Sequence, residues 1–232
     1  MIPLRDINPT ERFSVITFFL IIVNVAVFVF ELAIGDKAGN LFVESFALVP
    51  KRLFSYHDTV GGAMPAVVTL FTSMFIHGGI LHIAGNMLYL WIFGNNIEDA
   101  TGRLRFIIFY LLCGLFAAYA HAYMNRDSVT PMIGASGAIS GVLGAYLLLY
   151  PRARVVTLVF FGFYVRTVEV PAMLVLGFWF LLQFLNALLS SGSTGGVAWY
   201  AHVSGFVAGM LLIGLFKRKR VPFGGGRRFR NI

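Results

Sequence analysis

Four polar side chains stand out because they fall within, or at the start of, long apolar stretches: Ser136, His202, His82 and Asn86. A histidine can accept the proton of a serine hydroxyl, which makes the serine a nucleophile toward a carbonyl carbon. Imidazole and amide N–H groups can donate hydrogen bonds to the oxyanion that this attack creates. The set predicts acyl transfer, with Ser136 as nucleophile, His202 as general base, and His82 and Asn86 as oxyanion donors.

Ser136 lies in the sequence Gly134-Ala135-Ser136-Gly137, at the predicted start of a helix. Backbone N–H groups at a helix N-terminus can stabilise an oxyanion, and small neighbours let a substrate backbone approach. A serine in a transmembrane helix can instead donate to a carbonyl one turn earlier, with no chemical role. Short glycine motifs recur by chance, so this motif alone leaves both interpretations open.

Small residues on the same helical face strengthen the case for His202. Gly205 and Gly209 follow it by three and seven residues, which places them on its side of the helix. Glycine and alanine form a similar stripe beside Ser136, and such faces let two helices approach closely, whether for chemistry or for packing alone. The glycines expected to pack at the site are Gly134, Gly137, Gly141, Gly205 and Gly209.

His82 and Asn86 are four residues apart and therefore share one face of their helix. With the backbone N–H of the serine, they could surround an oxyanion. The alternative is a helix–helix hydrogen bond worth only ~0.6 kcal/mol. His77 precedes two glycines where this helix is expected to begin, and it could simply support the loop.

Membrane-spanning helices are the elements that must position these residues. The chain of 232 residues is 58% apolar and 12% charged, which is too little charge for the surface of a soluble domain. Its apolar residues form long runs, as in helices of about 20 residues that cross a bilayer. We predict an all-α membrane protein with a bundle of six transmembrane helices. The predicted spans are residues 13–34, 80–93, 103–124, 136–150, 171–189 and 201–216.

Two connections are unusual. Residues 35–66 are expected to form a long loop of mixed composition, too long for a simple linker. Residues 155–165 are apolar but flanked by arginines, and we predict either an amphipathic segment or a hairpin there.

The net charge of +8 is distributed as in a membrane protein. Six spans place both termini on one side, and 14 of the 18 lysines and arginines fall on that side. The positive-inside rule therefore predicts cytoplasmic termini, most simply in a plasma membrane such as the bacterial inner membrane. The basic tail suits an anionic lipid surface, so membrane lipids are expected partners and nucleic acid is not. The predicted division is a cytoplasmic segment 1–12, a membrane domain 13–216 and a basic tail 217–232.

This topology brings the polar residues to one depth. Spans two, four and six all run from outside to inside, and the candidate residues lie early in each span. They are therefore expected in the outer half of the membrane. Ionisable and amide groups are costly there and are functional candidates by default.

These motifs resemble the rhomboid family, and the resemblance extends over nearly the whole chain. The three motifs fall on spans two, four and six in the family's order. They are the run from His77 through His82 to Asn86-Met87-Leu88, the run Gly134-Ala135-Ser136-Gly137-Ala138-Ile139-Ser140-Gly141, and Ala201-His202 with Gly205 and Gly209.

The resemblance implies a rhomboid-like bundle and an intramembrane serine protease with a Ser–His dyad, without a carboxylate, cofactor or metal. It would cut transmembrane protein substrates near the outer membrane surface. Ser136 would attack the carbonyl, and His202 would take its proton and pass it to the leaving amine. The resemblance also implies that span five, with Phe178 and Trp179, and the loop 190–199 form a lateral and an upper gate.

The chain departs from the family pattern at two places. Many members carry an aromatic residue four positions after the nucleophile, under the histidine, and Ser140 stands there instead. The orientation of His202 then depends on a hydrogen bond, for which Ser140 is itself a candidate. The Trp-Arg pair common in the first loop is also missing, and Lys51-Arg52 is the nearest basic pair.

Three other functions are compatible with parts of this sequence. A catalytically inactive rhomboid-like protein usually lacks the serine or the histidine, and both are present here. A channel or transporter would be expected to carry acidic residues or broken helix pairs at the midplane, a pattern that the spans lack apart from Glu31 near an outer end. A haem protein could use His82 and His202 as ligands, in which case the serine motif would be coincidental.

Overall fold

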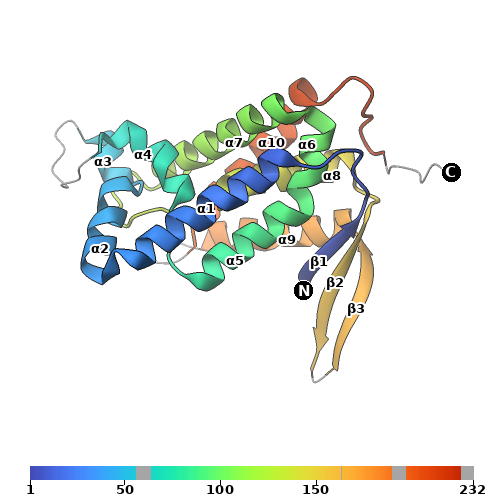
Figure 1. Cartoon of the computed structure of the whole chain (residues 1–232), viewed down its shortest axis with the longest axis horizontal. Helices are drawn as coiled ribbons and strands as arrows, with labels where there is room; N and C mark the ends of the chain where they lie inside the picture. Colours follow the sequence, from blue (N-terminus) through green and yellow to red (C-terminus); the bar gives the residue numbers. More distant parts are fainter. Residues whose placement is uncertain (56–63, 163, 190–196, 226–232) are drawn as a thin grey trace.

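The computed structural model describes residues 1–55, 64–162, 164–189 and 197–225, and it is mainly helical (Figure 1). Most long helices run along one axis, with α2 and α3 at one end and a small sheet at the opposite end. The helical elements are α1 (Val15–Ala33), α2 (Gly35–Phe46), α3 (Pro50–Phe54), α4 (Ala66–Thr72), η1 (Ser73–Phe75), α5 (Ile80–Tyr89), the π-helical turn η2 (Leu90–Gly94), α6 (Asn95–Thr101), α7 (Arg103–Met124), α8 (Ser136–Leu149), α9 (Ala172–Leu189) and α10 (Trp199–Phe216). The strands are β1 (Ile2–Ile7), β2 (Arg154–Phe161) and β3 (Tyr164–Pro171).

A helix coincides with each predicted span. The helices α1, α7, α9 and α10 are long and apolar enough to cross a membrane, and residues 66–75 with 80–101 make a fifth candidate, bent by 80°. The helix α8 has only 14 residues, and nearly all of them are buried. A helix that is apolar and buried on all sides belongs to the interior of a bundle. The chain is therefore a helical membrane protein, as predicted.

The second span is longer than the predicted 80–93, because the helix continues through η2 and α6 to Thr101. Three polar side chains of α6 are buried and bonded to other parts of the chain, namely Asn96, Glu98 and Asp99. The Glu98 carboxylate accepts the backbone N–H groups of Ile16 and Thr17 at 3.1 and 2.8 Å, and the Thr17 hydroxyl at 2.9 Å. It thus supplies the N-terminal cap that the preceding residue, Ser14, does not supply through its side chain.

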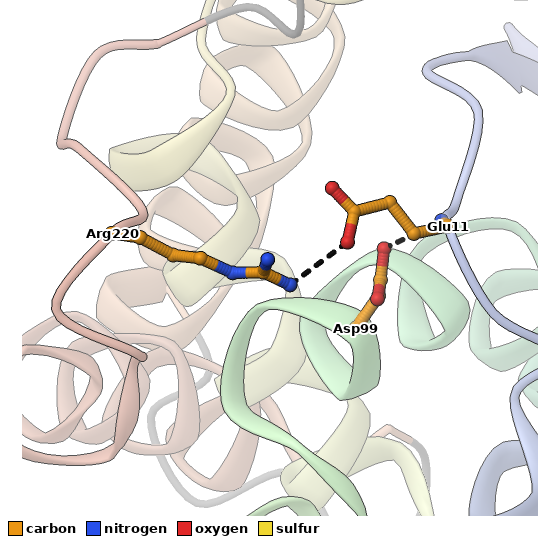
Figure 2. A network of polar contacts seen from close by, with 3 residues as sticks. All are labelled: Glu11, Asp99 and Arg220. Atoms are coloured by element: carbon orange, nitrogen blue, oxygen red, sulfur yellow. Dashed lines mark hydrogen bonds and ion pairs between the residues drawn. The ribbon is translucent and has the colours of Figure 1, made fainter.

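A second polar link lies beside this cap (Figure 2). Asp99 accepts the backbone N–H of Glu11 at 2.8 Å, and the Glu11 carboxylate pairs with Arg220 at 2.8 Å. The Glu11 and Arg220 side chains are about half exposed, so this ion pair adds little stability. The link nevertheless joins the segment before α1, the end of α6 and the residues after α10.

The long connection 35–66 contains two helices, α2 and α3, among its described residues. Leu48 and Met132 form an isolated antiparallel bridge, which ties this connection to the turn before α8. Arg52 is buried, and its guanidinium donates to the carbonyl of Met64 at 2.8 Å. The connection is therefore a packed part of the fold at the end where α8 and α10 begin.

The connection 155–165 forms a β-hairpin, which is one of the two predicted alternatives. The strand β2 pairs antiparallel with β3, and the strand order is β1-β2-β3. The outer strand β1 was not predicted, because residues 1–12 were interpreted only as a polar segment. Its partner β2 is distant in sequence: Ile2 pairs with Leu158 and Asp6 with Val155.

Asp6 anchors this sheet to the helices. Its carboxylate accepts the Tyr146 hydroxyl at 2.8 Å and the Asn96 amide at 2.7 Å. Burial raises the pKa of Asp6 to about 6, and these hydrogen bonds only partly oppose that shift.

We expect the stability of the fold to depend on pH through Asp6. A carboxyl group with a raised folded-state pKa contributes stability that is present below about pH 4 and is lost as the pH rises to about 6. The resulting loss in the free energy of unfolding is at most about 3 kcal/mol. The thermal unfolding midpoint in detergent should therefore fall across this window relative to Asp6→Asn. If the difference between the thermal midpoints of wild type and Asp6→Asn stayed constant from pH 4 to 7, the raised pKa of Asp6 would be contradicted.

Candidate active site

Ser136 and His202 are in hydrogen-bonding contact although they come from different helices. Ser136 is the first residue of α8, and His202 lies in the first turn of α10. The Ser136 Oγ is 2.8 Å from the His202 Nε2. The imidazole is 8% exposed and the serine is half-buried. This distance lies within the range that proton transfer between the two groups requires.

Glycines lie where α8 and α10 meet. A Cβ added to Gly205 would collide with the carbonyl of Gly137, and one added to Gly209 would collide with the backbone of Gly141. On the other side, a Cβ on Gly137 would stand 2.7 Å from the Cβ of Ala117 in α7. The two helices therefore approach at backbone distance, which no larger side chain at these positions would allow.

His82 and Asn86 lie on α5 and reach the turn that leads into α8. Gly134 in this turn has a φ of +116°, and a Cβ there would stand 2.7 Å from the His82 Nε2. Only glycine permits both the conformation and the approach. The His82 Nδ1 accepts the Gly78 N–H at 3.4 Å, which leaves Nε2 to carry the proton. The His82 donor therefore points toward the chain just before the serine.

Asn86 is held by His77, which lies in the break between η1 and α5 rather than within a helix. The Asn86 Nδ2 is 2.9 Å from the His77 Nε2. An amide nitrogen carries two hydrogens, so a second one is left to donate elsewhere. His77 thus holds the side chain of Asn86 in place, a contact that goes beyond the support of the loop expected from the sequence.

Ser140 does not orient His202, which corrects the suggestion drawn from the sequence. Its hydroxyl donates to the Ser136 carbonyl at 2.6 Å, the bond that a helical serine makes readily one turn back. The aromatic neighbours of the imidazole come from outside α8. The ring of Trp179 on α9 lies 5.9 Å from it between centroids, and the ring of Trp199 lies 6.2 Å away, edge-on.

The sequence reasoning missed Gln183, a buried residue of α9. Its Oε1 lies 2.7 Å from the His202 Nδ1. The signal that could have found it was present, because an amide in the middle of the apolar run 171–189 is costly to bury and needs a partner.

The surroundings of the serine are tightly packed. A cavity of about 10 Å³ adjoins Ser136, Gly134 and Gly137, with room for about one water molecule. On α9, Phe178 is about half exposed at the surface of the bundle, whereas Trp179 is turned toward the imidazole. Residues 190–196 of the expected upper gate and residues 226–232 of the basic tail lie outside the described residues.

Comparison with known proteins places the chain in a family. A family model described as the Rhomboid domain matches residues 65–219. RHOMBOID-like protein 4 of Arabidopsis thaliana is 28% identical over 214 residues, which are 83% of this chain and 50% of that protein. Rhomboid protease GluP of Bacillus subtilis is 34% identical over 143 residues, which are 62% of this chain and 25% of that protein.

The relatives also include Rhomboid protein 1, mitochondrial, of Saccharomyces cerevisiae, which is 34% identical over 97 residues, 40% of this chain and 28% of that protein. The chain thus spans half or less of the length of these curated relatives. One of the three relatives, GluP, is named as a protease. Because the domain match covers most of the chain and the whole candidate site, this chain belongs to the rhomboid family.

Proposed function

We propose that this chain is an intramembrane serine endopeptidase that hydrolyses peptide bonds of transmembrane protein substrates, with Ser136 as nucleophile and His202 as general base. The observation that carries the proposal is the hydrogen bond of 2.8 Å between the Ser136 Oγ and the His202 Nε2. A buried histidine paired with a serine at a helix start is the arrangement that activates a hydroxyl for acyl transfer.

The reaction follows from these two groups. The Oγ attacks the substrate carbonyl carbon while its proton moves to the His202 Nε2, which leaves negative charge on the carbonyl oxygen. As the tetrahedral adduct collapses, the carbon–nitrogen bond breaks and the imidazolium protonates the leaving amine. Water then hydrolyses the acyl-enzyme in the same manner and frees Ser136. The chain's own side chains suffice for each proton transfer.

His82, Asn86 and the backbone N–H of Ser136 would stabilise the oxyanion. Both side chains approach Gly134, two residues before the serine, and the start of α8 leaves its first N–H groups without helical acceptors. Donors aimed at a developing negative charge contribute more in a dry site than in water.

His82→Ala and Asn86→Ala should each lower kcat by roughly 10²-fold with a smaller change in KM. The losses should not add in the double variant, because both donors act on one charge. Leu81→Ala is the matched control, since this neighbour on α5 is 89% exposed. If both His82→Ala and Asn86→Ala turned over substrate at the wild-type rate, the two side chains would serve helix packing only.

The site would work near the outer surface of the membrane, with both termini in the cytoplasm. The support is the excess of lysine and arginine on the side of the termini. The ends of α8 and α10 that carry the dyad point away from that side. We further propose that the membrane domain of residues 13–216 lies in a plasma membrane, which is the inner membrane in a bacterium.

A direct test uses a fluorophosphonate probe on purified protein, followed by peptide mass mapping. The probe should label Ser136, and the protein in liposomes should cut a single-span test substrate at a bond near one membrane surface. Labelling of another serine would overturn the nucleophile assignment. Absence of both labelling and cleavage would favour the alternative of a catalytically inactive rhomboid-like protein.

A further inference from the structure

We propose that Gln183 on α9 is a positioning residue, which fixes the tautomer and the ring orientation of His202. The inference rests on the proposed function of the Ser136–His202 pair and adds a third residue to it.

The hydrogen bonds of the imidazole determine which nitrogen carries its proton. The Gln183 Oε1 lies 2.7 Å from Nδ1, and the Ser136 Oγ lies 2.8 Å from Nε2. An amide oxygen only accepts hydrogen bonds, so Nδ1 must be the protonated nitrogen of the neutral ring. The lone pair is then on Nε2, where it can accept the serine proton. Without the amide, the ring could adopt the opposite tautomer, which cannot act as a base toward Ser136.

The same helix also holds the face of the ring. Trp179 lies one turn before Gln183 on α9, and its ring plane is inclined by 34° to the imidazole. Because Ser140 bonds back to its own helix, the side chain at this position of α8 gives no such support. These two contacts, from Gln183 and Trp179, thus come from α9, which carries neither member of the dyad.

An amide suits this environment better than the carboxylate of a soluble serine protease. A second charge buried at membrane depth would be costly to desolvate. The neutral amide oxygen can orient the ring and still accept from Nδ1 when His202 becomes an imidazolium. The competing explanation is that Gln183 only joins α9 to α10, a bond worth ~0.6 kcal/mol that would leave the chemistry unchanged.

Three variants separate these explanations. Gln183→Met keeps the length of the side chain but removes the strong acceptor, and Gln183→Glu keeps the acceptor. Asn186→Leu is the control, because this amide of α9 is half-buried and donates to the Leu182 carbonyl on its own helix. Each protein would be assayed for kcat and KM on a single-span test substrate, for the rate of fluorophosphonate labelling, and for its thermal midpoint.

We expect Gln183→Met to lower kcat and the labelling rate by roughly 10- to 100-fold, by analogy with the loss seen when the hydrogen-bonding partner that orients a metal-bound histidine is removed. KM should change little, Gln183→Glu should recover most of the lost rate, and Asn186→Leu should match wild type. Equal labelling rates in wild type and Gln183→Met would overturn the inference, as would a loss in Gln183→Met that Gln183→Glu does not restore although its thermal midpoint matches that of wild type. Failure of the proposed function would look different, because wild-type protein itself would then neither cut nor be labelled.

Discussion

Ser136→Ala should abolish proteolysis while the protein stays folded. The substitution removes one oxygen and therefore the atom that forms the acyl-enzyme, so we expect a loss of about 10⁴-fold or more in kcat. The fold loses only the hydrogen bond to the His202 Nε2, which is worth about 1 kcal/mol net. Cleavage of a single-span substrate in liposomes and the thermal midpoint in detergent measure the two effects separately.

The matched variant is Ser140→Ala, because this serine lies one turn further along α8 and its hydroxyl donates to the Ser136 carbonyl of the same helix. It should cut at nearly the wild-type rate. A Ser136→Ala protein that retained more than a small fraction of wild-type cleavage would remove the nucleophile from the mechanism.

Gly205→Leu should abolish activity by a different route. Its side chain would collide with the carbonyl of Gly137, which is backbone and cannot rotate away. The helices α8 and α10 would have to separate, and a displacement of about 1 Å can cost 10²-fold in rate. Overpacking costs ~1–3 kcal/mol, so the thermal midpoint should fall together with cleavage.

Val207→Leu is the control for added volume on the same helix, because Val207 is 39% exposed on the outer side of α10. It should leave both measurements close to wild type. Unchanged cleavage in Gly205→Leu would mean that the dyad does not need the close helix contact.

The helical part of the fold could be predicted because the physical signals were local. Each span is a run of apolar residues long enough to be recognised, and Ser136 and His202 stand at the starts of two such runs. Their small neighbours indicated a close helix contact without any knowledge of the partner. The sequence could not locate the end of the second span, because the polar residues of α6 resemble a loop until their bonding partners, such as the start of α1, are known.

The features that the sequence did not predict depend on contacts between segments that are far apart in the chain. The strand β1 has no local signal, and its pairing with β2 follows only from the folded chain. Ser140 could have donated to the imidazole or to its own helix, and the geometry of a helix favours the bond one turn back. Gln183 was visible as a polar residue in an apolar run, but its partner on α10 was not.

The pairing of β1 with β2 has a consequence for biosynthesis. Residue 2 pairs with residue 158, so the first strand leaves the ribosome long before its neighbour exists. It must remain unpaired while α1 to α8 are made and inserted, and closing so long a loop carries a larger entropic cost than any contact within a helix. The pairing of β1 with β2 can therefore form only after α1 to α8 have been made.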